Sequence, residues 1–438
     1  MFLGVPGLKK SLFWTAVLVA LSAAVISCGN SSSNNQHKLS GLAFRAFVSN
    51  PLFASGGLNS PVLNIVNASK DTLSPSVVSL AGTASQPGLM ALSPDLRVTA
   101  VFSPAGDAVA VIENASEGPA PIAGTSATIS SIPLPGPTES MFIGNNDLAF
   151  AGVPTATVTG EAPGAVAVFS VANGAVVATI PVPAAHFIAP TRDNRHVLVF
   201  SDGSDAVTII TVALIGTHED PRTTVCCFDH PVWAVAGSDN NTAYVLSCGA
   251  ECNGVQASIG ALDVLTGTIV KTVPVPAATY GMVSGGILYV AGTAPGTPCG
   301  GNTAAKNCGT LTMLNASSLH QVGGPVTITN GYHDRMGMSS NGQLFVGANS
   351  CTSINSGGEV RGCLAIVNTT NSNKVTVPPQ VGDATGIAPV PGRNIVYVCQ
   401  DGVFQIFDTT TDMLLVQTTP TVIVGQSFDV KIVDPPPS

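Results

Sequence analysis

Charged side chains are scarce in this chain of 438 residues: Asp, Glu, Lys and Arg together make up 9% of it, and aromatic residues only 5%. Long surface helices need a regular supply of charged residues, and no extended stretch shows the 3.6-residue hydrophobic period of such helices. Gly and Pro are abundant instead, with 46 and 32 copies. The composition therefore excludes a helical bundle and predicts many short buried strands joined by turns.

Basic residues are few and dispersed, with 16 Lys and Arg against 25 Asp and Glu. When the two lysines of the N-terminal segment are set aside, 14 basic and 25 acidic residues remain, a formal charge of −11. No run of Lys or Arg forms a basic patch that would attract phosphate groups. We therefore predict that the chain has no nucleic-acid partner.

Motifs for catalysis and for cofactors are also missing from the sequence. There is no Gly-rich phosphate loop, no HExxH and no GxSxG. The seven histidines show no short metal-ligand spacing, and Ser201–Asp205 (SDGSD) lacks the closing Glu of a calcium loop, so a hairpin turn explains it better. We predict no cofactor and no metal, and we favour a protein that is not an enzyme.

Residues 1–27 have the features of a bacterial export signal. Lys9 and Lys10 precede an apolar stretch, Leu12–Val25, which is shorter than the roughly 20 residues of a membrane span. Val25-Ile26-Ser27-Cys28 resembles the lipobox of bacterial lipoproteins, which is cleaved before a lipid-carrying cysteine. An ordinary secretory signal and a short transmembrane helix are the alternatives.

The lipobox resemblance implies a lipid-attached Cys28 and a membrane partner for the chain. Residues 28–40 would then be the lipidated cysteine and a polar tether, and residues 41–438 the folded domain. Gly29 follows the cysteine instead of the Asp that retains many lipoproteins in the inner membrane. By resemblance, the expected location is the bacterial cell envelope at the outer membrane, on either its periplasmic or its surface side.

A two-strand unit recurs along the folded part of the chain. Its clearest copy is Ile395–Asp412 (IVYVCQDGVFQIFDTTTD), in which Asp401-Gly402 predicts a tight hairpin turn. The second strand and the turn that follows it occur eight times, roughly 40 to 56 residues apart, which is the range of propeller blades. An Asn or Asp that can accept backbone N–H bonds begins the turn in six copies: Asn67, Asn114, Asp263, Asn315, Asn368 and Asp408.

Further hydrophobic segments bring each period to four strands, with no helix between them, and predict antiparallel sheets packed radially. ILYVAG (287–292), IFDTTTD (406–412) and VVATIPVP (176–183) resemble the YVTN-type β-propeller repeat. The resemblance covers residues 41–434 and implies an all-β fold with a single propeller of eight four-stranded blades. Seven blades are the alternative if one copy is misassigned.

The two ends of the repeat array are complementary. The first copy lacks an inner strand, whereas SFDVKIVD (427–434) is a spare strand at the other end. We expect this C-terminal strand to complete the first blade, because a ring closed in this way has no free sheet edge.

Nine cysteines follow Cys28, in an exported and therefore oxidising setting. Two insertions between the second and third strands of a blade are flanked by cysteines, so we predict the disulfides Cys299–Cys308 and Cys351–Cys363. Cys248 and Cys252 occupy the same place one blade earlier; they pair with each other or with Cys226 and Cys227. Cys399 lies inside a strand, and we interpret it as a buried small hydrophobe.

The longest loops and nearly all cysteines fall on one face of blades five to seven, and loops held rigid on a scaffold are common binding surfaces. Five residues near the starts of inner strands are candidates to line the mouth of a central channel, although packing is the commoner role at such positions. These candidates are His186, Trp233, Tyr280, Tyr332 and His333.

The features together predict a membrane-anchored, non-catalytic propeller that binds a protein or a small ligand on the loop face of blades five to seven. One alternative is an assembly or scaffold factor for outer-membrane proteins, since a lipoprotein of that machinery is also an eight-bladed propeller. The alternative from another class is a hydrolase similar to the propeller lactonases, with its site at the channel mouth.

Overall fold

The computed structural model describes residues 38–51, 54–55, 58–59, 62–80, 87–296, 307–351, 362–418 and 421–437. Lys38–Ser438 form one compact unit. Its described residues form β-strands and two short 3-10 turns, η1 (Val212–Leu214) and η2 (Gly249–Cys252), joined by loops. Cys28 and the remainder of the expected signal and tether before Lys38 lie outside the described residues. In these ranges, no helix has the length and apolar character that crossing a membrane requires.

Eight of the nine sheets formed by the described strands are blades, which confirms eight blades rather than seven. From the innermost strand outward, the first four blades are β35 (Val430–Ile432), β1 (Arg45–Asn50), β4 (Val62–Asn67), β5 (Thr72–Ser79); β6 (Met90–Leu92), β7 (Val98–Ser103), β8 (Ala108–Glu113), β10 (Ile132–Pro133), with β9 (Gly118–Pro119) also beside β8; β11 (Ser140–Ile143), β12 (Leu148–Val153), β13 (Ala165–Ser170), β14 (Val176–Pro181); and β15 (Ala185–Pro190), β16 (His196–Ser201), β17 (Val207–Thr211), β18 (Arg222–Val225).

The other four blades follow the same order. They are β19 (Pro231–Ala236), β20 (Thr242–Ser247), β21 (Ser258–Asp263), β22 (Thr268–Pro274); β23 (Tyr280–Ser284), β24 (Ile287–Gly292), β25 (Gly309–Asn315), β26 (Val326–Ile328); β27 (Tyr332–Met338), β28 (Gln343–Asn349), β29 (Leu364–Asn368), β30 (Lys374–Thr376); and β31 (Ala384–Pro389), β32 (Ile395–Gln400), β33 (Val403–Asp408), β34 (Met413–Leu414). A separate hairpin pairs β2 (Ala54–Ser55) with β3 (Leu58–Asn59).

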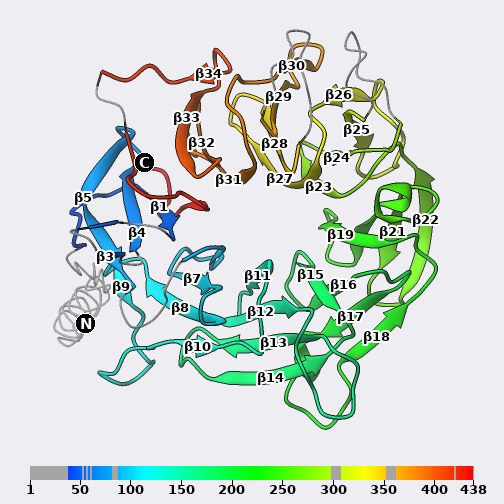
Figure 1. Ribbon diagram of the computed structural model, residues 1–438. Helices are drawn as coiled ribbons and strands as arrows, with labels where there is room; N and C mark the ends of the chain where they lie inside the picture. Colours follow the sequence, from blue (N-terminus) through cyan, green and yellow to red (C-terminus); the bar gives the residue numbers. More distant parts are fainter. Residues whose placement is uncertain are drawn as a thin grey trace, which may run out of the picture. The chain divides into compact units, whose positions relative to one another are not determined.

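The eight sheets stand around a ring (Figure 1), and each innermost strand contacts the innermost strands of both neighbouring blades. The hydrophobic core is divided in the same way, because each cluster of buried side chains lies between two adjacent blades. Between blades seven and eight, for example, Phe345 meets Phe407 edge to face, with ring centroids 5.7 Å apart. Middle strands therefore bury both faces, which is why they read as continuous hydrophobic runs.

The turns behave largely as the repeat predicts. Asp401 and Gly402 both have positive φ, 51° and 75°, and join β32 to β33 in a two-residue hairpin of the kind that Asp-Gly favours. The side chain of Asp263 accepts the backbone N–H groups of Leu265 and Thr266, and Asn67, Asn315, Asn368 and Asp408 accept equivalent bonds. Asn114 differs, because its buried side chain bonds Thr99 Oγ1 and the Leu96 carbonyl instead.

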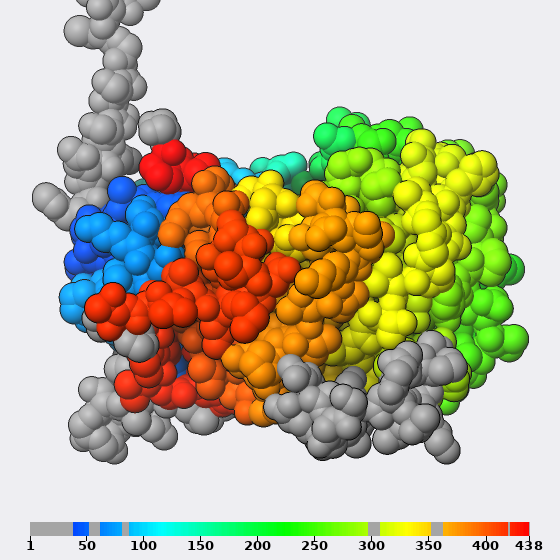
Figure 2. All heavy atoms as spheres, turned by 90° about the horizontal axis from the view of Figure 1, so that it is seen from above, coloured from blue at the N-terminus to red at the C-terminus, as the bar shows by residue number. Residues whose placement is uncertain are grey.

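The ring closes as predicted, with the C-terminal strand β35 antiparallel to β1 inside the first blade. Arg45 of β1 is fully buried and donates two hydrogen bonds to Asp434, just beyond β35, at 2.7 and 2.8 Å. Its third bond reaches Glu117 of blade two at 2.5 Å. In the space-filling view, the red and orange C-terminal residues lie directly against the blue N-terminal blade (Figure 2).

A second buried carboxylate, on blade one, bonds two side chains of blade eight. Asp71, in the turn after β4, accepts two bonds from the guanidinium of Arg393, both at 2.6 Å, and one from the hydroxyl of Tyr397 at 2.6 Å. Bidentate pairing of this kind has a strict geometry and is stronger than a neutral hydrogen bond. The seam is therefore held by polar groups in addition to the β-ladder.

Replacing Arg45 by Met should destabilise the propeller by roughly 3–5 kcal/mol, because it leaves Asp434 and Glu117 buried without their cation. Urea unfolding followed by circular dichroism measures this change. Arg195→Met is the matched control. The Arg195 side chain is 82% exposed, and its one ion pair among the described residues, with Asp193, is long at 3.6 Å. Equal unfolding midpoints for the two variants would contradict the role given to the seam.

Candidate functional site

Two adjoining cavities lie where the inner strands of blades three to seven meet the loops of one face. The first, about 330 Å³, includes loop residues such as Asp202, His230 and Cys252 and is called the mouth cavity. The second, about 170 Å³, reaches across to Met90 and Lys431 and is called the inner cavity. Both cavities are lined by Glu139, Phe187, Val232 and Tyr332. They therefore form one continuous recess.

A recurrent β-bulge directs side chains into this recess. In the innermost strands of blades four, five and seven, the pairing register shifts at the second or third residue. A bulge places two successive residues of one strand opposite a single residue of its partner and redirects their side chains. In these three blades the residue pairs so placed line a cavity: His186-Phe187, Val232-Trp233 and Asp334-Arg335. Blade eight has the same bulge at Thr385-Gly386, which lines neither cavity.

Aromatic rings form a continuous row across blades four to six. His186 stacks on Phe187 with centroids 4.1 Å apart, and Phe187 meets Trp233 edge-on at 6.5 Å. Trp233 in turn stacks on Tyr280 with centroids 4.8 Å apart and an interplanar angle of 30°. Rings that support one another in this way are held in place before any ligand arrives, which lowers the entropic cost of binding.

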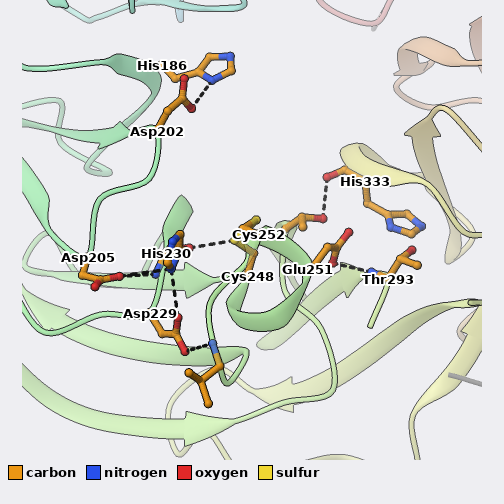
Figure 3. Close-up of a disulfide and its surroundings, with 12 residues drawn as sticks. His186, Asp202, Asp205, Asp229, His230, Cys248, Glu251, Cys252, Thr293 and His333 are labelled. Carbon is orange, nitrogen blue, oxygen red and sulfur yellow. Dashed lines mark hydrogen bonds and ion pairs between the residues drawn. A yellow bond between two sulfur atoms is a disulfide. The ribbon is translucent and has the colours of Figure 1, made fainter. Parts of the chain in front are cut away.

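His186 is held between two carboxylates. Its Nδ1 lies 2.8 Å from Asp202 and its Nε2 3.1 Å from Glu139 (Figure 3 draws the Asp202 contact). Burial by itself lowers the pKa of His186, but the hydrogen bonds to Glu139 and Asp202 outweigh it and raise the pKa above 6.5. Both nitrogens donate only when the ring is protonated, so the trio favours an imidazolium.

The two cations of the inner cavity are already paired within the chain. Arg335 lies 3.5 Å from Asp334 and donates to the Thr385 carbonyl at 3.1 Å, while Lys431 lies 3.0 Å from Asp429. Burial raises the pKa of Asp334 above its usual range. Its Oδ2 accepts a bond from Asn349, whereas its buried Oδ1 has no hydrogen-bond partner among the described residues.

A disulfide braces the loop at the mouth cavity. Cys248 and Cys252 are bonded to each other across η2, and Cys252 lines the cavity (Figure 3). Of the alternatives left open by the sequence, the structure thus has the local pair. Cys226 and Cys227 are both free and exposed, with their sulfur atoms 2.6 Å apart.

The loops of the next two blades are braced in the same position. Cys351 is bonded to Cys363, and Cys308 is disulfide-bonded as well; Cys299, its expected partner, lies outside the described residues. Cys399 is buried and free. Three consecutive blades thus carry a disulfide-bonded cysteine after their second strand, and a covalent bridge restrains the chain at that point.

Glu251 connects these loops from blade five to blade seven. Its Oε2 accepts the Thr293 N–H at 2.7 Å (Figure 3), and Thr293 Oγ1 donates to the Gly331 carbonyl at 2.9 Å. Burial raises the pKa of Glu251 to about 8, although the bond from Thr293 acts in the opposite direction. Glu251 is therefore mostly protonated at neutral pH.

Four of the five candidates from the sequence lie at the recess, namely His186, Trp233, Tyr280 and Tyr332. His333 is misplaced as a channel-mouth residue, because it is 0% exposed and its Nε2 bonds the Thr329 carbonyl at 3.0 Å. Burial lowers the pKa of His333 to about 4. Its neighbours Tyr332 and Asp334 face the cavity, so strand alternation turns the histidine away.

Sequence reasoning missed the charged residues of the recess. Glu139, Asp202 and the adjacent pair Asp334-Arg335 come from three separate parts of the chain, in loops and at a bulge, and Glu251 beside the recess comes from a fourth. The one available signal was position, since Asp334-Arg335 follows Tyr332 in the same inner strand. Asp205, Asp229 and His230 also approach one another within 4.8 Å beside the mouth, but Asp229 already accepts backbone bonds from Val255 and Gln256.

Replacing Glu251 by Gln should remove a pH-dependent loss of stability. Between about pH 4.5 and 8 the folded state holds a proton on Glu251 that the unfolded chain releases, so rising pH favours unfolding. The loss amounts to roughly 1.4 kcal/mol for each pH unit of this window. Urea unfolding at pH 5 and pH 8 should show wild type losing more stability than Glu251→Gln; Glu219→Gln, at an exposed site, is the control.

No family model matches the chain, and no curated protein matches its sequence. Solved structures do match its fold. Dihydro-heme d1 dehydrogenase NirN, solved in complex with DHE, has a TM-score of 0.60 at 11% identity, covering 90% of this chain and 75% of that one. Hydrazine synthase of Kuenenia stuttgartiensis has a TM-score of 0.52 at 12% identity, covering 76% and 96%.

A functionally unknown protein from Desulfotomaculum acetoxidans has a TM-score of 0.51 at 14% identity, covering 90% of this chain and all of that one. Identities this low establish a shared architecture and carry no activity from one protein to another. Together with the closed ring of eight blades, these similarities identify the chain as a β-propeller.

Proposed function

We propose that the chain is a bacterial envelope lipoprotein, anchored through Cys28, whose propeller binds a ligand or a partner protein without catalysing a reaction. The observation that carries the proposal is the recess at the channel mouth. Preformed aromatic rings line it, and the Cys248–Cys252 disulfide of blade five braces a loop at its mouth. Rigid loops on one face of a stable scaffold are characteristic of binding sites.

The arrangement of polar groups supports binding over catalysis. His186, the histidine that lines the mouth cavity from an inner strand, has both nitrogens engaged by Asp202 and Glu139. A general base needs an unprotonated nitrogen directed at the substrate, and the raised pKa of His186 works against this. His333, the other histidine considered for a lactonase-like hydrolase, is buried away from the recess.

The membrane anchor rests on the lipobox sequence Val25–Cys28 and on the polar segment that follows it. One lipid chain binds membranes only marginally, whereas several attach a protein stably. The mostly polar segment 29–37 would let the propeller stand away from the bilayer, since the folded unit begins at Lys38. An outer-membrane location accords with Gly29, and a role in assembling outer-membrane proteins is one form that partner binding would take.

Affinity capture from solubilised native envelopes tests the binding proposal. Full-length protein should enrich a specific protein or small molecule, and Tyr332→Ala should reduce that enrichment about tenfold or more, as expected for loss of a central aromatic contact. Val270→Ala, at an exposed position on the outer strand β22, should bind as wild type does.

Equal capture by all three proteins would contradict binding at the recess. Hydrolysis of a lactone panel that is lost in His186→Ala would favour the hydrolase instead. Thermal unfolding of each variant establishes that the propeller is intact.

The lipid anchor is tested by growing cells that express the protein with radioactive palmitate. Wild type should carry the label and fractionate with membranes, and Cys28→Ala should do neither, because the thiol that accepts the lipid is gone. Cys399→Ala provides a control for the loss of an unrelated thiol. Equal labelling of wild type and Cys28→Ala would refute the anchor.

A further inference from the structure

We propose that the mouth cavity binds the charged head of a small organic cation, such as a substituted ammonium group. This inference rests on the proposed binding function of the same recess and specifies the chemical class of its ligand. Three independent features lead to it: the sign of the charges that line the cavity, the aromatic rings beside them, and the size of the space.

The lining of the mouth cavity is acidic. Glu139 and Asp202 line it, and the described lining residues include neither Lys nor Arg. Both carboxylates are accessible, with side chains 75% and 61% exposed. His186 between them offsets one charge when protonated, so the trio still carries a net charge of −1.

The cations nearby are held elsewhere. Arg335 and Lys431 line the inner cavity, and each is paired with a carboxylate close to it in sequence, Asp334 and Asp429 respectively. The bond with His186 lowers the pKa of Glu139 and the charge of Arg335 lowers it further, but within the mouth cavity Glu139, Asp202 and a protonated His186 still sum to −1. The buried Oδ1 of Asp334 adds an acceptor that has no donor within the described residues, and buried acceptors in folded proteins normally have one.

Aromatic rings stand beside these carboxylates. Phe187 and Tyr332 line both cavities, and Trp233 and Tyr280 continue the aromatic surface into the inner cavity. The face of an aromatic ring attracts a cation within about 6 Å of its centroid, most strongly for Trp and Tyr. Aromatic rings together with carboxylates favour a cation over a neutral or anionic molecule of the same shape.

The space suits a small molecule. A cavity of about 330 Å³ that continues into one of about 170 Å³ is at the lower end of the range for ligand pockets. A trimethylammonium head with a short chain fits this volume. The carboxylate-flanked mouth would accept the charged head, and the inner cavity the remainder of the ligand.

Fluorescence of Trp233 provides the test. The chain has two tryptophans, so in full-length protein carrying Trp14→Phe the signal comes from Trp233 alone. Choline is the cationic probe, and 3,3-dimethylbutan-1-ol is its uncharged isostere. We expect choline to change the fluorescence saturably, with an affinity at least about tenfold higher than that of the alcohol.

Variants assign the effect to residues. The double variant Glu139→Gln, Asp202→Asn should weaken choline binding about tenfold while leaving the alcohol unaffected. Tyr332→Leu should weaken choline binding, and Tyr332→Phe, which keeps the ring, should retain it. Glu219→Gln, an exposed carboxylate at the rim of blade four, is the matched control.

The outcomes separate this inference from the proposed function. Equal affinity for choline and the alcohol, or choline binding that ignores the double variant, would overturn the preference for a cation. If envelope capture depends on Tyr332 but choline does not bind, the preference for a cation is wrong, whereas the recess remains a binding site. Loss of both would refute the proposed function itself.

Discussion

The structure depends above all on closing the ring between its first and last blades. Each blade buries its two faces against its neighbours, so an open seam would expose two apolar sheet faces and a strand edge together. β35 supplies the missing inner strand. Arg45 and Asp71 reinforce it with charged hydrogen bonds that join both chain ends and blades one, two and eight. Such pairs have strict geometry and so define how the ends meet.

Closing the ring brings side chains from distant parts of the chain together at the channel mouth. Glu139 and Arg335 are almost 200 residues apart in sequence and line the same cavity. Bulges in three inner strands direct paired side chains inward, while disulfides and the Glu251–Thr293 bond restrain the loops above. The blades repeat regularly, and the recess forms where bulges and long loops interrupt the repeat.

The repeat was sufficient to predict blade number, strand order and the closing strand, because short hydrophobic runs and Asp-Gly or Asx turns act locally. It was also sufficient to locate four of five residues at the recess, since inner-strand starts share one end of the channel. His333 was misplaced because its side chain lies on the opposite side of β27 from Tyr332 and Asp334. Successive residues of a strand point to opposite faces, so Tyr332 and His333 cannot both face the recess. The bulge that follows brings both Asp334 and Arg335 to the inner cavity, and no local sequence pattern indicates it.

Local sequence patterns are enough to define the architecture: an all-β array of eight units whose ends are complementary, and the cysteine-flanked insertions in blades six and seven. Those properties follow from interactions within a unit or between its immediate neighbours. Tertiary structure alone decided that Cys248 pairs with Cys252, that His186 lies between Glu139 and Asp202, and that Arg335 is paired with Asp334. The charge and shape of the recess depend on residues from separate blades. Those residues come close to one another only when the ring has closed.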